Sequence, residues 1–147
     1  MDDKQRDLSE ALARAREAIA IEADAVRALE GRIDDQFARA VELILDCSGR
    51  VVVTGMGKSG AVGRKLAATL ASTGTPALFL HPAEGVHGDL GMVAAGDVLV
   101  VLSQSGWTDE VTALVTAMKR IDVPIIAFTG RAHSPLADQA AVTINVS

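Results

Sequence analysis

Short apolar runs alternate with helical patterns from Arg50 to the end of this chain. The runs cover residues 51–53, 76–80, 98–102, 124–129 and 142–146, and helical patterns follow at about 60–72, 109–120 and 134–140. A glycine-rich loop, 81–91, joins the second run to the third. Such alternation predicts a parallel sheet with helices on both faces and right-handed crossovers. For five strands we predict the order 2-1-3-4-5, with ligands bound beyond the carboxyl ends of strands 1 and 3.

Two further helices are expected before this core. Residues 4–30 carry apolar side chains near helical spacing, Gly31 interrupts, and a second pattern runs over 34–47. These helices either cover the core or form an oligomer surface. We therefore predict one domain over 1–147, with helices in 1–48 and the α/β core in 49–147.

Composition excludes several classes of protein. Hydrophobic residues make up 49% and charged residues 22% of the 147, which is typical of a globular domain. No apolar run approaches the length that spans a bilayer, and one cysteine, Cys47, allows no internal disulfide. We expect a cytoplasmic protein without a membrane partner. A net charge of −5 without a basic stripe argues against nucleic acid, and it requires any phosphate site to act locally.

The turn after the third strand is the best candidate for such a site. The buried strand Val98–Leu102 leads into Ser103-Gln104-Ser105-Gly106-Trp107-Thr108, and Asp109 and Glu110 then open a helix that closes on Lys119 and Arg120. Hydroxyls that face a helix N-terminus hold phosphate well, because the unpaired amide N–H groups and the positive end of the dipole add to them. We predict that a sugar phosphate binds here.

A second glycine-rich turn follows the first strand. Gly55-Met56-Gly57-Lys58-Ser59-Gly60 matches the dinucleotide pattern, but the second strand ends in His81-Pro82 without the acid that would hold a ribose. A nucleoside triphosphate loop would need glycine at residue 52, which is valine. No nucleotide cofactor is therefore expected. The turn brings backbone close to a ligand, and Lys58 either points at that ligand or is a solvated loop charge.

Several of these strings resemble one family. The phosphate loop Ser103–Thr108 resembles that of the sugar isomerase (SIS) fold. Residues 55–60, Ala71-Ser72-Thr73-Gly74-Thr75-Pro76 and His87-Gly88-Asp89-Leu90-Gly91-Met92 resemble its arabinose 5-phosphate isomerase (KpsF/GutQ-like) branch. The resemblance covers about Val51 to Val146. It implies a flavodoxin-like sheet and interconversion of D-ribulose 5-phosphate and D-arabinose 5-phosphate, which feeds synthesis of 3-deoxy-D-manno-octulosonate for lipopolysaccharide. It implies no cofactor.

The resemblance also implies roles for individual residues. Lys58, Glu110 and His87 match catalytic positions of the family, and His81 matches a histidine that also meets inhibitory zinc. The positions expected to contact substrate are Gly57, Ser59, Gly74, Thr75, His81, Ser103, Gln104, Ser105 and Thr108.

Aldose–ketose isomerisation passes through an enediol(ate), so it needs a base and a group that offsets charge on the oxygens. Glu110 suits the base, and Lys58 or His87 suits the second role. The alternative for Glu110 is a first-turn acid that interacts with the helix dipole. The alternative for His87 is a structural loop histidine. His81, Glu84 and His87 do not form a convincing metal set.

Two departures from the family pattern carry expectations. Trp107 stands where the family usually has a polar residue. The family continues past the position of Ser147 with a second glutamate, a closing loop, a helix, a catalytic histidine and, in many members, CBS domains. We therefore expect a missing last helix, an uncovered apolar face near Val142, Ile144 and Val146, and weak or no activity of this chain alone. The family implies a homodimer or homotetramer with shared sites. The alternative function is a non-catalytic phosphosugar-binding regulatory module.

Overall fold

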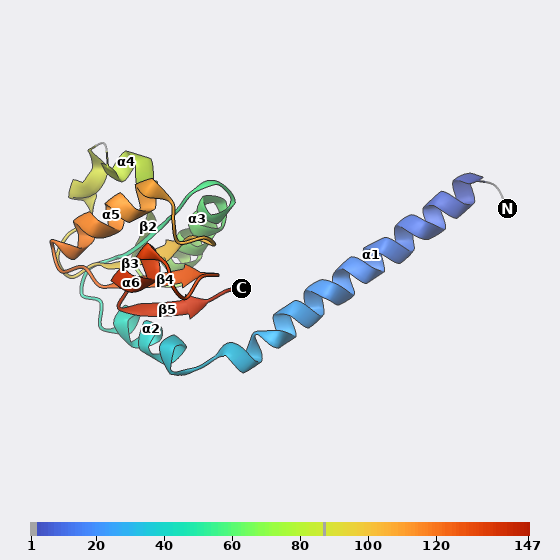
Figure 1. Ribbon diagram of the computed structural model, residues 1–147, viewed down its shortest axis with the longest axis horizontal. Helices are drawn as coiled ribbons and strands as arrows, with labels where there is room; N and C mark the ends of the chain where they lie inside the picture. The colour runs from blue at the N-terminus through green and yellow to red at the C-terminus, as the bar shows by residue number, and fades with distance from the viewer. Residues whose placement is uncertain (1–2, 87) are drawn as a thin grey trace. The chain divides into compact units, whose positions relative to one another are not determined.

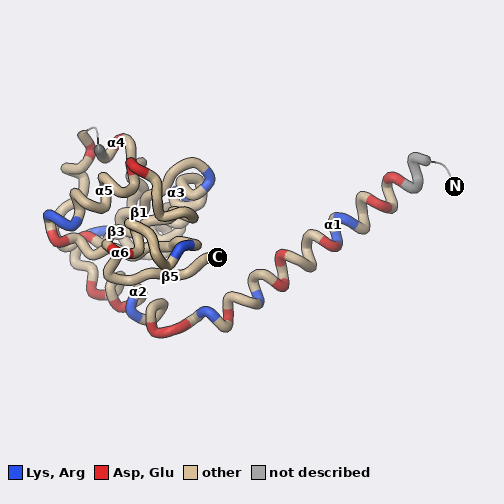
Figure 2. The backbone as a smooth tube through the Cα atoms, in the orientation of Figure 1, with Lys and Arg blue, Asp and Glu red and all other residues tan. Residues whose placement is uncertain are grey.

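The computed structural model describes residues 3–86 and 88–147, and the chain divides into two compact units, Met1–Asp34 and Asp35–Ser147. The first unit holds helix α1 (Asp3–Ala28) and the short 3₁₀ helix η1 (Glu30–Arg32). Acidic and basic residues are spread along the length of α1 (Figure 2), and its apolar side chains, such as Leu12 and Ile19, are exposed.

The second unit is built on a five-stranded parallel sheet in the order β2-β1-β3-β4-β5 (Figure 1). This order confirms the prediction. The strands are β1 (Val51–Gly55), β2 (Ala77–Phe79), β3 (Val98–Leu102), β4 (Ile125–Thr129) and β5 (Val142–Asn145). Strands β1 and β3 pair along their whole length, from Val51 with Val98 to Gly55 with Leu102. The switch point of the strand order therefore lies between them.

Helices cover both faces of the sheet, as the alternation predicts. On one face α5 (Asp109–Lys119) and α6 (Pro135–Gln139) pack against the side chains of Leu99, Val101 and Ile125. On the other face α2 (Asp35–Leu45) and α3 (Gly57–Ser72) cover Val53, Val100 and Ile126. Because both faces are covered, the central strands are continuous apolar runs, without the alternation of a half-exposed sheet.

Helix α3 begins at Gly57, three residues before the expected start. Lys58 and Ser59 therefore lie in its first turn and not in a loop. Gly57 adopts φ +54°, and a Cβ at Gly60 would lie 2.6 Å from the Gly55 carbonyl oxygen. The glycines let the helix start directly at the end of β1. The spacing of apolar residues does not reveal such a backbone contact, so it predicted a later start.

The segment predicted as a glycine-rich loop contains two short helices, α4 (Pro82–Val86) and the 3₁₀ helix η2 (Asp89–Met92). Pro82 occupies the first helical position, where a missing N–H is tolerated. Both helices are too short to show a helical repeat in the sequence.

The apolar face expected to be open near the fifth strand is partly covered. The prediction is wrong for Val142, which is 1% exposed and belongs to the core that α2 covers. Ile144 is half-buried and Val146 is 39% exposed. The helix α2 covers the core through Ala40, Leu43 and Ile44, while Val41 and Leu45 stay exposed. Within residues 3–86 and 88–147 no helix has both the length and the hydropathy to cross a bilayer.

Candidate functional site

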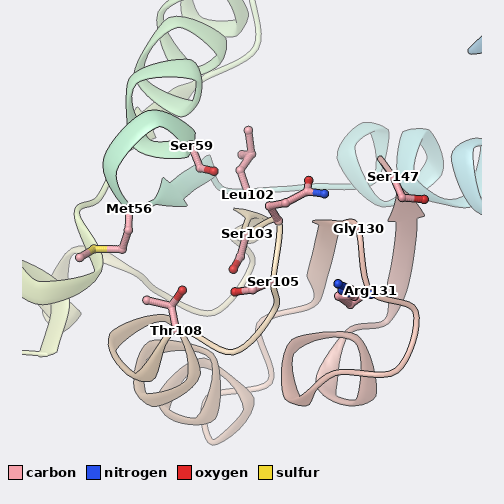
Figure 3. Close-up of a pocket in the computed structure, with 10 residues that line it drawn as sticks. Met56, Ser59, Leu102, Ser103, Ser105, Thr108, Gly130, Arg131 and Ser147 are labelled. Atoms are coloured by element: carbon pink, nitrogen blue, oxygen red, sulfur yellow. The ribbon is translucent and has the colours of Figure 1, made fainter. Parts of the chain in front are cut away.

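A hollow of about 550 Å³ lies at the carboxyl ends of β1, β3 and β4 (Figure 3). Its volume is in the range of small-molecule sites, and its place beside the switch point is where open α/β sheets bind ligands. The residues that line it are Met56, Ser59, Leu102, Ser103, Gln104, Ser105, Thr108, Gly130, Arg131 and Ser147. The four loop residues that were predicted to contact substrate are thus brought together with Ser59. They are Ser103, Gln104, Ser105 and Thr108.

The loop Ser103–Thr108 presents its hydroxyls to one space. The side-chain oxygens of Ser103, Ser105 and Thr108 point toward one another from three positions of the loop (Figure 3). Ser103 Oγ accepts a hydrogen bond from the Gly106 N–H at 3.2 Å, and Ser105 Oγ accepts one from the Trp107 N–H at 3.3 Å. Each serine hydroxyl is an acceptor in these bonds, so its own hydrogen is left to donate to an anion.

Two helix N-termini open at this hollow. Thr108 is the N-cap of α5 and Met56 is the N-cap of α3, and neither cap side chain bonds to the first turn. The first backbone N–H groups of a helix have no intrahelical acceptor, and they carry the positive end of the dipole. Both helices therefore direct partial positive charge toward the hollow, which favours an anionic ligand.

Lys58 lies beside this hollow without lining it. It is exposed, and it lines a second hollow of about 480 Å³ together with Val62, Leu66 and Phe128. The two hollows share Ser59, Leu102, Ser103 and Gln104, so they are neighbours. Lys58 is therefore next to the phosphate loop but outside the hydroxyl-lined hollow. Gly57, at the start of the same helix, lines neither.

Glu110 and His81 are placed near the same edge of the sheet but do not line the hollow. Glu110 is exposed in the first turn of α5, one turn beyond the loop. His81 follows β2, is half-buried, and its carbonyl accepts the Gly85 N–H at 2.9 Å. His87 lies outside the described residues. Among the residues that the structure describes, no cluster of three or more possible metal ligands occurs, and the zinc contact of His81 stays a prediction.

Gly74 and Thr75 are separated from the other predicted residues. They precede β2 and line a small hollow with Val51, the first residue of β1. This is the amino edge of the sheet. A five-residue strand spans roughly 15 Å, so within one chain they cannot meet a ligand held at the carboxyl edge.

Sequence reasoning missed several lining residues, above all Gly130 and Arg131. Both follow β4 directly, and β4 is the neighbour of β3. The predicted strand order already placed the end of the fourth strand beside the phosphate loop. Reading the residues after every strand end, and not only after the first and third, would have found them.

Fold and site together define a parallel α/β domain with a hydroxyl-lined ligand hollow at its switch point. The chain belongs to the SIS domain family, whose model matches residues 44–147.

The chain is similar to named isomerases over most of its length. It is 53% identical over 133 residues to arabinose 5-phosphate isomerase KdsD of Pseudomonas aeruginosa, and 50% identical over 131 residues to KdsD of Escherichia coli K12. It is 44% identical over 141 residues to arabinose 5-phosphate isomerase GutQ of Salmonella typhi. These matches cover 90%, 89% and 95% of this chain but only 41%, 40% and 44% of the relatives.

Solved structures share the fold. A protein of E. coli CFT073 in complex with arabinose 5-phosphate has a TM-score of 0.87 and 39% identity, over 93% of this chain and 73% of that one. A putative sugar-phosphate isomerase from Listeria monocytogenes has a TM-score of 0.89 and 32% identity, over 93% and 72%. The NanR protein of Vibrio vulnificus, complexed with ManNAc-6P, has a TM-score of 0.74 and 26% identity, over 94% and 54%.

Proposed function

We propose that this chain is the sugar isomerase domain of an arabinose 5-phosphate isomerase. It interconverts D-ribulose 5-phosphate and D-arabinose 5-phosphate on the way to 3-deoxy-D-manno-octulosonate and lipopolysaccharide. The hollow lined by Ser59, Ser103, Ser105 and Thr108 is the observation that carries the proposal. The identity to relatives named for this activity supports the choice of substrate.

The phosphate of the substrate sits at the hydroxyls of the loop, between the two helix N-termini. Hydroxyl and amide donors bind phosphate without the need for a strongly positive protein surface, which suits a net charge of −5. In this arrangement the loop positions the sugar, and the reacting carbons C1 and C2 lie at the far end of the pentose.

Glu110 is the base that moves the proton between C1 and C2. Its carboxylate forms no ion pair among the described residues, so it is not engaged in a structural bridge. Lys58 or His87 offsets charge on the oxygens of the enediolate. Because neither Glu110 nor Lys58 lines the hollow, and because the chain spans about 40% of its relatives, turnover by the chain alone is expected to be weak.

We also infer that copies of the chain associate in the cytoplasm as a homodimer or homotetramer. Gly74 and Thr75, at the amino edge of the sheet, then contact a substrate held by another subunit. Sedimentation velocity at several concentrations tests this inference, and a monomer at all of them would contradict it.

A non-catalytic phosphosugar-binding module is the second candidate. The NanR protein, whose solved structure is a complex with ManNAc-6P, shares the fold at 26% identity. A related domain therefore occurs together with a sugar phosphate in a protein that is not named an isomerase. In this case the hollow binds the phosphosugar as a signal and Glu110 has no chemical role.

An assay of both binding and turnover separates these functions. Calorimetry with D-arabinose 5-phosphate and with unphosphorylated D-arabinose measures binding, and NMR with isotope-labelled substrate follows conversion to the ketose. We expect the phosphorylated sugar to bind at least about 10-fold more tightly, a difference of ~1.4 kcal/mol. Conversion at any rate contradicts the non-catalytic module, and no binding of either sugar contradicts both functions.

A further inference from the structure

The loop that follows β4 is held against the phosphate loop. The Gly130 N–H donates to the Gln104 carbonyl at 3.0 Å, and Thr129 Oγ1 donates to the same oxygen at 3.4 Å. A Cβ at Gly130 would collide with the side-chain amide of Gln104, so the absence of a side chain there permits the close approach. The backbone of the next residue, Arg131, is therefore held beside the hydroxyl-lined hollow.

The backbone of Arg131 is satisfied within its own loop. Its N–H donates to Thr129 Oγ1 at 3.2 Å, and its carbonyl accepts from Ser134 Oγ at 3.1 Å. Arg131 is one of the residues that line the hollow, and it lies across the hollow from Ser103 and Ser105 (Figure 3). Its guanidinium forms no ion pair with an aspartate or glutamate among the described residues. The Arg131 guanidinium is therefore a cation at the edge of the site that is not held in a structural ion pair.

Charge in this region calls for such a cation. Among the ten lining residues Arg131 is the one with an ionised side chain. Asp109 and Glu110 open α5 next to the loop, and the whole chain carries −5. The hydroxyls and helix N-termini bind a phosphate through hydrogen bonds and partial charges, and a full positive charge on Arg131 adds to them and offsets the nearby carboxylates of Asp109 and Glu110. Arginine offers a planar pair of donors that matches two phosphate oxygens.

We propose that Arg131 is the cation that recognises the phosphate group of the substrate and makes the site selective for phosphorylated sugars. Lys58, which lines the neighbouring apolar hollow, is then left for the sugar end of the substrate. This inference rests on the proposed function, since it assigns a residue to the same site. It names a residue for the phosphate that the sequence motifs did not include.

Replacement of the charge tests the assignment. Arg131→Gln should weaken binding of D-arabinose 5-phosphate by about 10- to 100-fold in calorimetry, because charge-assisted hydrogen bonds are lost. Arg131→Lys keeps the charge without the planar pair and should fall between Arg131→Gln and the unaltered chain. Arg120→Gln is the matched control: it removes the same charge at the far end of α5 and should leave binding unchanged.

The outcomes distinguish the two proposals. If the unaltered chain fails to bind D-arabinose 5-phosphate, the proposed function falls. If it binds, and Arg131→Gln binds within about 2-fold of it, the proposed function stands and the role of Arg131 is overturned.

A measurement on the unaltered chain tests the role of Arg131 even if a variant misfolds. The Arg131 Nε–H resonance, assigned by its loss in Arg131→Lys or in Arg131→Gln, should shift as D-arabinose 5-phosphate is added. A resonance that stays in place at saturation overturns the assignment.

Discussion

The hydroxyl oxygen of Ser103 accepts a hydrogen bond from the backbone N–H of Gly106 at 3.2 Å, and this contact closes the turn that follows β3. One side chain thereby shapes the loop and faces the ligand hollow. Ser103 is 6% exposed, so its position is set by the core beneath it.

Removal of this hydroxyl should damage binding more than folding. In Ser103→Ala the loss of one hydrogen bond costs about 1 kcal/mol of unfolding free energy. Binding of D-arabinose 5-phosphate should fall by about 10-fold or more, because a donor and the loop geometry are lost together. Calorimetry and urea unfolding measure the two effects. Ser72→Ala, at the exposed end of α3, is the control and should leave binding intact.

Gly106 should not tolerate a side chain. It adopts φ +69°, and a Cβ there would collide with the side chain of Ser134. Strain of this kind costs on the order of 1–3 kcal/mol, so Gly106→Ala should lower the midpoint of urea unfolding and weaken sugar phosphate binding. Gly91→Ala is the matched control, since nothing lies within 4 Å of its Cβ position. Equal midpoints for the two variants would contradict this account of the loop.

Glu110→Gln should abolish chemistry without loss of binding. Turnover, measured on a preparation in which it is detectable, should drop by about 10²- to 10⁴-fold, the usual contribution of a general base. The affinity for D-arabinose 5-phosphate should stay within about 3-fold, because the side chain does not line the hollow. Asp109→Asn is the control at the neighbouring position of the same helix turn. Undiminished turnover would remove Glu110 from the mechanism.

Trp107 should report the occupied site. It is the single tryptophan, it is 64% exposed, and its backbone N–H donates to Ser105 Oγ in the phosphate loop. Emission should change on addition of sugar 5-phosphates and hardly at all on addition of the unphosphorylated sugars. A response of equal size to both would show that the phosphate is not what the loop detects. Thr108→Ala should reduce the response, since Thr108 lines the hollow.

Much of the fold and part of the site could be read from local pattern. The apolar runs at Val51 and Val98 are strands because their length and β-branched content suit a sheet covered on both faces. The phosphate loop was found because its hydroxyls and the helix that starts at Asp109 are contiguous in the chain. The start of α3, by contrast, depends on the backbone of Gly57 and on the close approach of Gly60 to Gly55. The spacing of apolar residues does not predict either feature.

The sequence by itself determined the class of fold and the six residues of the loop, because apolar periodicity and turn residues are local in the chain, and the strand order followed from the general rule for alternating strands and helices. The tertiary structure decided which of the residues that follow the strand ends share a site. It brought Gly130 and Arg131 to the loop, placed Lys58 in the next hollow, and separated Gly74 and Thr75 from both. The physical reason is that side chains from different strands meet only through the packing of the whole sheet, where glycines permit close approach and helices fill the remaining space.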